Sequence, residues 1–426
     1  MSKFFVVLVF LCFLNPLWCD QRRIGIIEAS LASYYDLGSN QGNFYPSQNY
    51  PDLSVTGALI STTGALGTAT LVAPNYIITA AHVVKNDYYE VPKALEWKFV
   101  LYHDIGKATS TEVYQIEELI VHPVWTARQT TSNNLGDGDE LGVDLALARL
   151  VRSVDNVFPA RLPSPEDDPL GERAVLGGFG TLVEGDTGYK ITSNERRVGG
   201  ENIIDRSVAK VFKSGVPADQ RGGVLGIDFD SPSGTSNTLH NNNNIELLGD
   251  GESDSTAIEL EASTADGDSG GPAFVFTKNA WRIHGVVSYG APGYNDSKYG
   301  DVTIYTRLAS HAEWIQDQLP DWADSKVLDD SGWVQNPWFG TLVSVSNDWI
   351  YHTNLGWLYI PLPKGNSFWG WSAHLSKWIW LSDQAFPFIY CYSSEGSFWM
   401  YVLLESSNGS IIRAYDYSSS SWQSYP

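Results

Sequence analysis

The sequence predicts an all-β protein followed by a second, smaller β module. Between residues 24 and 308, short runs rich in Val, Ile, Thr and aromatic residues alternate with Gly, Pro, Asn and Asp, as antiparallel strands and their turns do. Examples of these runs are Trp97–Tyr102, Val143–Leu150, Ile283–Ser288 and Thr303–Leu308. One helix is predicted over Ser310–Leu319, with Ser310 as its N-cap and Pro320 as its stop.

Residues 1–19 have the pattern of a secretory signal peptide. Lys3 precedes an apolar run, Phe4–Leu14, which is too short to span a membrane, and the polar residues 20–23 follow. A lipoprotein anchor at Cys19 is disfavoured because the large Trp18 precedes it. We therefore expect a soluble, exported protein that is extracellular, periplasmic or associated with the cell surface.

Cysteine usage, charge and metal-ligand patterns exclude several classes of protein. Cleavage after residue 19 leaves Cys391 as the only thiol, so we expect no intrachain disulfide. The formal net charge of -22 disfavours nucleic acid and anionic membranes, because phosphate binding requires clustered Lys and Arg. No His pair at helical spacing accompanies a carboxylate, as zinc hydrolases need. We expect no cofactor, although the acidic loops at residues 137–140 and 250–254 leave structural calcium open.

The composition changes sharply after a polar connector predicted at residues 321–330. Ten of the sixteen Trp residues lie in residues 331–426, which predicts a separate module. Its predicted hairpin strands are Gly356–Tyr359, Phe368–Trp371, Lys377–Trp380 and Phe398–Tyr401, and Ser418–Ser421 is predicted to be a turn. Two interpretations of the tryptophans stay open: a core of bulky side chains, or a platform for a polysaccharide or cell-surface ligand.

The segment Asp266–Pro272 has the composition of a loop that carries a nucleophilic serine. Small residues around Ser269 let a scissile carbonyl approach the backbone closely. In such a turn the N–H groups of Gly267 and Ser269 can converge on one point and stabilise a tetrahedral oxyanion. Without further residues, the segment also allows the interpretation of a plain Gly-rich loop.

A nucleophilic serine needs a base and an orienting carboxylate. His82 follows the apolar run Ile77–Ala81, and the small Ala80 and Ala81 leave room around its imidazole. Asp144 opens an apolar run that is able to bury it, and a buried carboxylate holds an imidazole in the right tautomer. His122 and His284 are predicted to be packed side chains without a chemical role.

These three segments together resemble the trypsin and chymotrypsin family. The matching motifs are Thr79–His82, Asp144–Leu147, Gly177–Gly180, Gly267–Pro272 and Ser288–Gly290, in that order. The resemblance covers residues 24–320 and implies a serine endopeptidase of two six-stranded antiparallel β-barrels, with the active site between them. It further implies that Ser288 supports Asp144. Val83 and Ala265 stand where many members have cysteines, which is more similar to bacterial branches of the family.

The resemblance also implies an activation pair and a substrate pocket. Residues 20–23 would form a short propeptide, and the new α-amino group of Ile24 would pair with Asp268. The pocket for the residue before the cleaved bond would contain Ser263, Ser288, Gly290 and Thr303. Because Ser263 is neutral and Thr303 is branched, we expect preference for small or medium uncharged residues. Asp266 and Asp301 are expected to be too solvated to attract a basic residue strongly.

Two other classes of function are compatible with the sequence. The first is an inactive protease fold that only binds a partner, although all three residues of the triad are present. The second is an adhesin or surface-binding protein in which the Trp-rich tail is the working part. If the tail only tethers the enzyme, the protease should survive without it.

Overall fold

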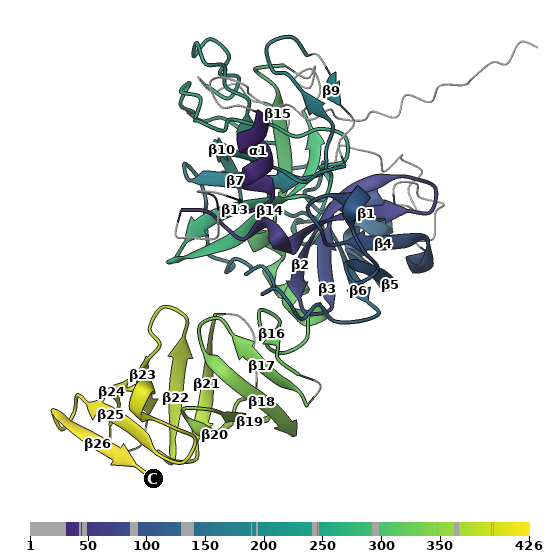
Figure 1. Cartoon of the computed structure of the whole chain (residues 1–426). Coiled ribbons are helices and arrows are strands. Elements are labelled where there is room, and N and C mark those ends of the chain that lie inside the picture. Colours follow the sequence, from purple (N-terminus) through teal and green to yellow (C-terminus); the bar gives the residue numbers. More distant parts are fainter. Residues whose placement is uncertain are drawn as a thin grey trace, which may run out of the picture.

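A computed structural model describes residues 31–426 except for short gaps (Figure 1). The gaps are residues 42–43, 45–48, 86–92, 129–139, 189, 193–194, 241–244, 246, 292–297, 330, 347, 362–365, 393 and 395. The predicted signal peptide, the propeptide and Ile24 therefore lie outside the described residues.

The first sheet is a closed six-stranded antiparallel barrel, as predicted. Its strands are β1 (Thr56–Ser61), β2 (Leu66–Ala73), β3 (Tyr76–Thr79), β4 (Trp97–Val100), β5 (Val113–Val121) and β6 (Ala146–Leu150). They are paired in the order β1-β2-β3-β6-β5-β4. Seven of the eight residues of β2 are buried. One side of the strand faces the barrel interior, and segments of the second sheet cover the other side, where Thr68 Oγ1 donates to the Gly267 carbonyl.

The second sheet has seven strands in the described residues, where the resemblance implies six. They are β7 (Arg173–Gly178), β10 (Val198–Ile203), β11 (Arg206–Val208), β12 (Val224–Asp228), β13 (Pro272–Thr277), β14 (Ala280–Gly290) and β15 (Val302–Arg307). They are paired in the order β10-β7-β13-β14-β15-β12-β11. A separate two-stranded sheet joins β8 (Leu182–Val183) to β9 (Lys190–Thr192). The predicted all-β class is confirmed.

Short helices flank the two sheets: α1 (Leu31–Gly38), α2 (Ala81–Val84), α3 (Pro123–Arg128) and α4 (Ala312–Gln318). The predicted C-terminal helix is present as α4, but the assignment of Ser310 as its N-cap is wrong. The cap is His311, because a 3-10 turn, Leu308–His311, precedes the helix, and the Ser310 hydroxyl donates to the Ala209 carbonyl instead. None of the helices in the described part of the chain has the length and apolar character needed to cross a membrane.

The tail forms one eleven-stranded antiparallel sheet in which the strands pair in chain order. Its strands are β16 (Lys326–Val327), β17 (Trp333–Asn336), β18 (Gly340–Ser346), β19 (Trp349–His352), β20 (Gly356–Tyr359), β21 (Ser367–Ser372), β22 (Lys377–Ser382), β23 (Phe388–Tyr392), β24 (Phe398–Val402), β25 (Ile412–Asp416) and β26 (Ser421–Tyr425). The predicted connector at residues 321–330 contains β16. It also holds Trp322, which stacks on Phe339 with ring centroids 5.6 Å apart. These residues therefore belong to the fold of the tail.

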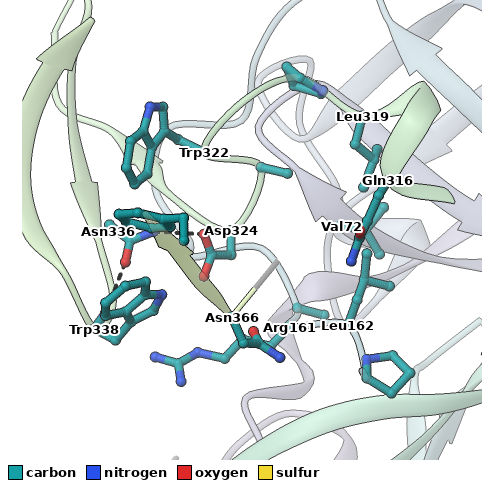
Figure 2. A pocket seen from close by; sticks show the side chains of 15 residues that line it. Val72, Arg161, Leu162, Gln316, Leu319, Trp322, Asp324, Asn336, Trp338 and Asn366 are labelled. Atoms are coloured by element: carbon teal, nitrogen blue, oxygen red, sulfur yellow. Dashed lines mark hydrogen bonds between the residues drawn. The ribbon is translucent and has the colours of Figure 1, made fainter. Parts of the chain in front are cut away.

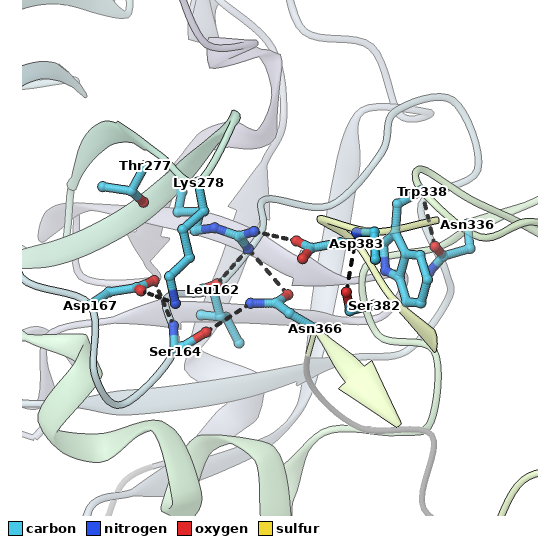
Figure 3. Close-up of polar contacts among 12 residues, drawn as sticks. Leu162, Ser164, Asp167, Thr277, Lys278, Asn336, Trp338, Asn366, Ser382 and Asp383 are labelled. Atoms are coloured by element: carbon cyan, nitrogen blue, oxygen red, sulfur yellow. Dashed lines mark hydrogen bonds and ion pairs between the residues drawn. The ribbon is translucent and has the colours of Figure 1, made fainter. Parts of the chain in front are cut away.

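The tail sheet is fixed to the N-terminal unit by a buried ion pair. Arg282 of β14 is fully buried and pairs with Asp383 of the tail, whose side chain is also buried. The Arg282 guanidinium also donates to the Leu162 carbonyl and to Asn366 Oδ1, each at 3.2 Å. Figure 3 shows Asn366 next to Leu162 and Ser164, with Asp383 on the tail side of the junction, and the Asn366 amide donates to Ser164 Oγ at 3.1 Å. The tail is thus docked by specific polar contacts.

A small cavity of about 60 Å³ lies at the same junction (Figure 2). Leu162 and Leu319 of the N-terminal unit line it, together with Trp322 and Trp338 of the tail. Asp324 lines it as well; burial raises the pKa of this carboxyl group, and Asn336 donates to its Oδ1 at 2.7 Å. Apolar and polar contacts therefore join the two parts of the chain.

We expect Asp383→Ala to destabilise the folded chain by about 3–5 kcal/mol, because it leaves the buried Arg282 charge without its carboxylate. Urea unfolding followed by tryptophan fluorescence measures this loss. Glu166→Ala is the matched control, since Glu166 pairs with Lys278 at the surface and should contribute about 1 kcal/mol or less. Equal, small losses in both variants would show that the junction contributes little stability.

Candidate active site

His82 lies in α2, directly after β3 ends at the barrel edge. Ala80 and Ala81 are fully buried, so the chain before the imidazole packs tightly against the barrel. The His82 backbone N–H donates to Asp144 Oδ1 at 2.9 Å, and Nδ1 lies 2.7 Å from Asp144 Oδ2. An ionised carboxylate only accepts hydrogen bonds, so Nδ1 carries the proton and Nε2 keeps its lone pair. His82 is therefore oriented as a base.

Asp144 lies just before β6 and is 1% exposed. Ser288 of β14 donates from Oγ to Asp144 Oδ2 at 2.6 Å, and Thr306 of β15 donates to the Asp144 carbonyl at 2.9 Å. Burial raises the pKa of Asp144, but His82 and the hydrogen bonds from His82 and Ser288 outweigh it and keep the pKa below its ordinary value. The carboxylate is therefore charged at neutral pH.

Ser269 lies in the loop before β13, and backbone hydrogen bonds fix this loop between the first barrel and β14 of the second sheet. The Thr68 N–H donates to the Ser269 carbonyl at 2.8 Å, and the Gly270 N–H donates to the Val287 carbonyl at 2.9 Å. Gly270 has φ +84°, and a Cβ there would lie 2.1 Å from Thr79 Oγ1. Only glycine fits this approach between the serine loop and β3.

Thr68 of β2 is a positioning residue that the sequence interpretation missed. Its Oγ1 donates to the Gly267 carbonyl at 2.7 Å and accepts from the Phe179 N–H at 3.2 Å. One side chain of the first barrel thus holds two loops of the second sheet. A hydroxyl on a fully buried strand position needs a partner, and that requirement is the signal that was available in the sequence.

The N–H groups of Gly267 and Ser269 are suited to bind an oxyanion. Within the described residues, neither N–H has a protein acceptor. Gly267 has φ +95°, a conformation that glycine adopts without strain. The predicted oxyanion donors therefore lie in one turn of the serine loop, with Ser269 itself partly exposed.

Asp268 is 1% exposed, and its carboxylate accepts from the Gly180 N–H at 2.9 Å and from the Ala265 N–H at 3.1 Å. Cβ atoms built at Gly178 or Gly180 would lie 2.1 and 2.2 Å from its oxygens. The Gly177–Gly180 motif therefore leaves room for Asp268. Its predicted partner, Ile24, lies outside the described residues.

The predicted pocket residues come together. Ser263 Oγ and Thr303 Oγ1 lie 2.9 Å apart, and Thr264 Oγ1 lies 2.9 Å from the same Thr303 oxygen. Thr303 pairs with Gly290 across β14 and β15, so the branched side chain lies beside the open wall at Gly290. The expectation that Asp301 is solvated is wrong: it is 3% exposed, and its carboxylate accepts from the Lys298 N–H at 2.9 Å in place of water.

His122 and His284 contact neighbouring side chains outside the candidate site, and the structure describes only part of the acidic loops. His122 lies against the rings of His311 and Trp314, and His284 Nε2 lies 2.9 Å from Thr277 Oγ1. Residues 137–139 lie outside the described residues, and Asp254 accepts from Thr256 in the second acidic loop. Among the described residues, no three His, Cys, Asp or Glu side chains gather in a way that could hold a metal ion.

A buried acidic pair lies beside the pocket floor. Ile227 of β12 pairs with Thr303, and the next residue, Asp228, accepts from the Leu239 N–H at 2.8 Å and donates its own N–H to Asp205 at 3.2 Å. Burial raises the pKa of Asp205, and the charge of Asp228 raises it further; burial also raises the pKa of Asp228. Two adjacent buried carboxyl groups then share a proton at neutral pH.

Known proteins resemble the N-terminal unit. A family model described as Trypsin matches residues 46–216 and 209–315, ending before the tail sheet. Chymotrypsin-like elastase family member 1 of Macaca fascicularis is 26% identical over 277 residues, which are 64% of this chain and 84% of the relative. Trypsin Tyr p 3.0101 of Tyrophagus putrescentiae is 28% identical over 250 residues, 58% of this chain and 69% of the relative. Vitamin K-dependent protein C of Oryctolagus cuniculus is 26% identical over 259 residues, 59% of this chain and 46% of the relative.

We expect Asp205→Asn to reduce the loss of stability at alkaline pH. The raised pKa means that the stability from this pair is fully present below the unfolded value of about 3.9 and is lost as the pH rises through the folded value. The amide of Asp205→Asn does not ionise, so the melting temperature of this variant should fall less between pH 5 and pH 9 than that of the wild type. A difference of 1 kcal/mol in the free energy of unfolding corresponds to about 2–4 °C, and we expect at least this difference. The exposed Asp219→Asn is the control. Parallel pH curves for wild type and Asp205→Asn would contradict the shared proton.

Proposed function

The chain belongs to the trypsin family of proteases, and on that premise we propose that it is a secreted serine endopeptidase with Ser269, His82 and Asp144 as its triad. The observation that carries the proposal is the pair of His82 and the buried Asp144, held by Ser288 at 2.6 Å. Its substrates are proteins or peptides.

The reaction uses the residues in the following roles. Ser269 Oγ attacks the scissile carbonyl while His82 Nε2 takes its proton, and the C–N bond then breaks as the same proton passes to the leaving amine. Water activated by His82 hydrolyses the acyl-enzyme. Asp144 orients His82 and stabilises its positive charge, and the N–H groups of Gly267 and Ser269 stabilise the oxyanion.

Export and activation belong to the same proposal. The signal at residues 1–19 would direct the chain out of the cell, and cleavage after Arg23 would free the α-amino group of Ile24 to pair with Asp268. The near-complete burial of Asp268 supports this role, because a buried carboxylate is stabilised by an added cationic donor.

We assign the tail a docked role in which it holds the N-terminal unit at a surface. The pair between Arg282 and Asp383 and the contact between Asn366 and Ser164 favour a fixed arrangement over a loose tether. A chain that ends near Pro320 should therefore be less stable than the full chain, contrary to the expectation from the sequence. The alternative of an inactive binding protein is disfavoured because His82 and Asp144 keep the geometry of a working base.

Ser269→Ala should abolish labelling by a fluorophosphonate probe and reduce kcat by roughly 10⁴–10⁶-fold, because nucleophile and base act as a unit. Labelling is read by gel fluorescence and turnover with a peptide substrate. Ser233→Ala, which changes an exposed serine, should label as the wild type does. Activity that survives in Ser269→Ala would remove this residue from the mechanism.

Among matched peptides with Ala, Leu, Phe or Arg before the cleaved bond, we expect the highest kcat/KM for Ala or Leu. Thr303 beside Ser263 narrows the pocket floor, and neither residue supplies a charge for Arg. Thr303→Gly is the matched variant and should raise the rate for Phe relative to Ala. A clear Arg optimum would show that the assignment of a neutral pocket floor is wrong.

A further inference from the structure

The two faces of the tail sheet differ in chemistry. The inner face contributes one aliphatic core with few rings: Leu342, Ile350, Leu358, Phe368, Ile379, Leu381, Ile389, Cys391, Met400, Val402, Ile412 and Ala414. None of the ten tryptophans in residues 331–426, all of which are described, is buried in this core. Trp338 is partly buried and packs against this core, but the other nine do not, so the interpretation as bulky core residues is wrong for those nine.

The outer face of the same strands carries the aromatic side chains. We define the aromatic face as Trp349, Tyr351, Trp357, Tyr359, Trp369, Trp371, Trp378, Trp380, Phe388, Tyr390, Tyr392, Trp399, Tyr401, Tyr415 and Trp422. Alternate strand residues point to opposite faces, so these residues share one side from β19 to β26. Figure 1 shows these strands following one another in chain order, away from the N-terminal unit.

Strand register aligns the rings in rows that cross the sheet. One row is Trp349, Tyr359, Trp371, Trp378 and Tyr392. A second row is Trp369, Trp380, Tyr390 and Trp399, and a third is Phe388, Tyr401, Tyr415 and Trp422. Within each row a ring recurs at every strand, about every 4.8 Å. The aromatic face is therefore periodic.

The rings hold one another in place. Trp371 and Trp378 meet edge to face at 6.0 Å, and Trp380 and Trp399 do so at 6.2 Å. Such pairs fix the rotamers of large side chains, so a ligand that contacts them orders few additional groups. Trp369 and Trp399 remain 43% and 41% exposed. The face is rigid and still accessible.

The aromatic face carries almost no charge. Arg413 is the only ionised side chain on the outer side of β19–β26, strands that the structure describes in full. The whole chain has a formal net charge of -22, which repels anionic polymers and anionic lipid surfaces. Indole N–H and tyrosine O–H groups at the ring edges can bond to uncharged hydroxyl groups.

We propose that the aromatic face binds a neutral, linear β-linked polysaccharide. Pyranose rings present apolar C–H faces to aromatic rings and hydroxyl groups to their edges, and the spacing of strands is close to the length of one sugar unit. A polymer of identical, uncharged sugar units can make the same contact with each ring of a row. An irregular protein surface cannot repeat its contacts in this way. The inference deepens the surface-holding role of the tail proposed above, and it does not depend on the catalytic chemistry.

The test is a sedimentation assay of the full-length chain, carrying Ser269→Ala to prevent autolysis, with microcrystalline cellulose, a β-1,3-glucan gel and chitin powder. We expect retention on at least one of the three. Trp369→Ala with Trp399→Ala should lower the bound fraction at least tenfold while the melting temperature stays within a few degrees. Phe212→Ala, which removes an 82% exposed ring from the N-terminal unit, is the matched control and should bind fully.

Each other outcome overturns the proposal. Absence of retention on all three polymers, or retention that the double variant keeps, excludes the aromatic face as a glycan site. If no glycan retains the chain and the double variant no longer forms concentration-dependent dimers, the aromatic face serves self-association. If no glycan retains the chain and the double variant no longer binds phosphatidylcholine vesicles, the face binds lipid. Peptide hydrolysis by the double variant with Ser269 intact should equal that of the wild type, so failure here and failure of the protease proposal are distinguishable.

Discussion

The buried carboxylate of Asp144 is the contact on which the arrangement of the N-terminal unit depends. A charge at 1% exposure is tolerated only where donors replace water, and here they come from both sheets. His82 contributes its backbone N–H and Nδ1 from the first barrel, while Ser288 contributes Oγ from β14 of the second. The Thr306 hydroxyl adds a bond to the Asp144 carbonyl from β15. The carboxylate that accepts from the proposed base, His82, therefore also sets the position of one sheet against the other.

Strand β14 connects the contact at Asp144 with the tail and with the predicted pocket. Near its start, Arg282 pairs with Asp383 of the tail; near its end, Ser288 bonds to Asp144, and Gly290 pairs with Thr303 of the pocket. The eleven residues of the strand thus contact the tail, the proposed triad and the predicted substrate pocket. Because interior packing is dense and transmits displacement, loss of the tail should displace this strand more than other parts of the N-terminal unit.

The sequence was sufficient to select candidate site residues where the pattern around them is local. Small residues before His82, an apolar run after Asp144 and glycines around Ser269 each restrict the backbone in a way that composition reveals. It was insufficient where a contact joins distant segments. Thr68 and Gly267 are 199 positions apart, and Arg282 and Asp383 are 101 apart, so no local pattern links them. Asp301 was placed in solvent for the same reason, because the chain there is held beside a distant segment: the Phe229 N–H donates to the Asp301 carbonyl at 2.9 Å.

The sequence of the tail shows the alternation of its two faces, but which face is buried depends on the size of the side chains. Segments such as Trp369-Gly370-Trp371 and Trp378-Ile379-Trp380 alternate large rings with small or aliphatic residues, so period two already separates two faces. Hydrophobicity alone does not say which face is buried, since both are apolar. Gly370 and Ile379 pair across β21 and β22, and side chains of this size allow close packing over the core. Rings with N–H or O–H groups at their edges are the apolar residues that best tolerate contact with water, so the large residues lie outside.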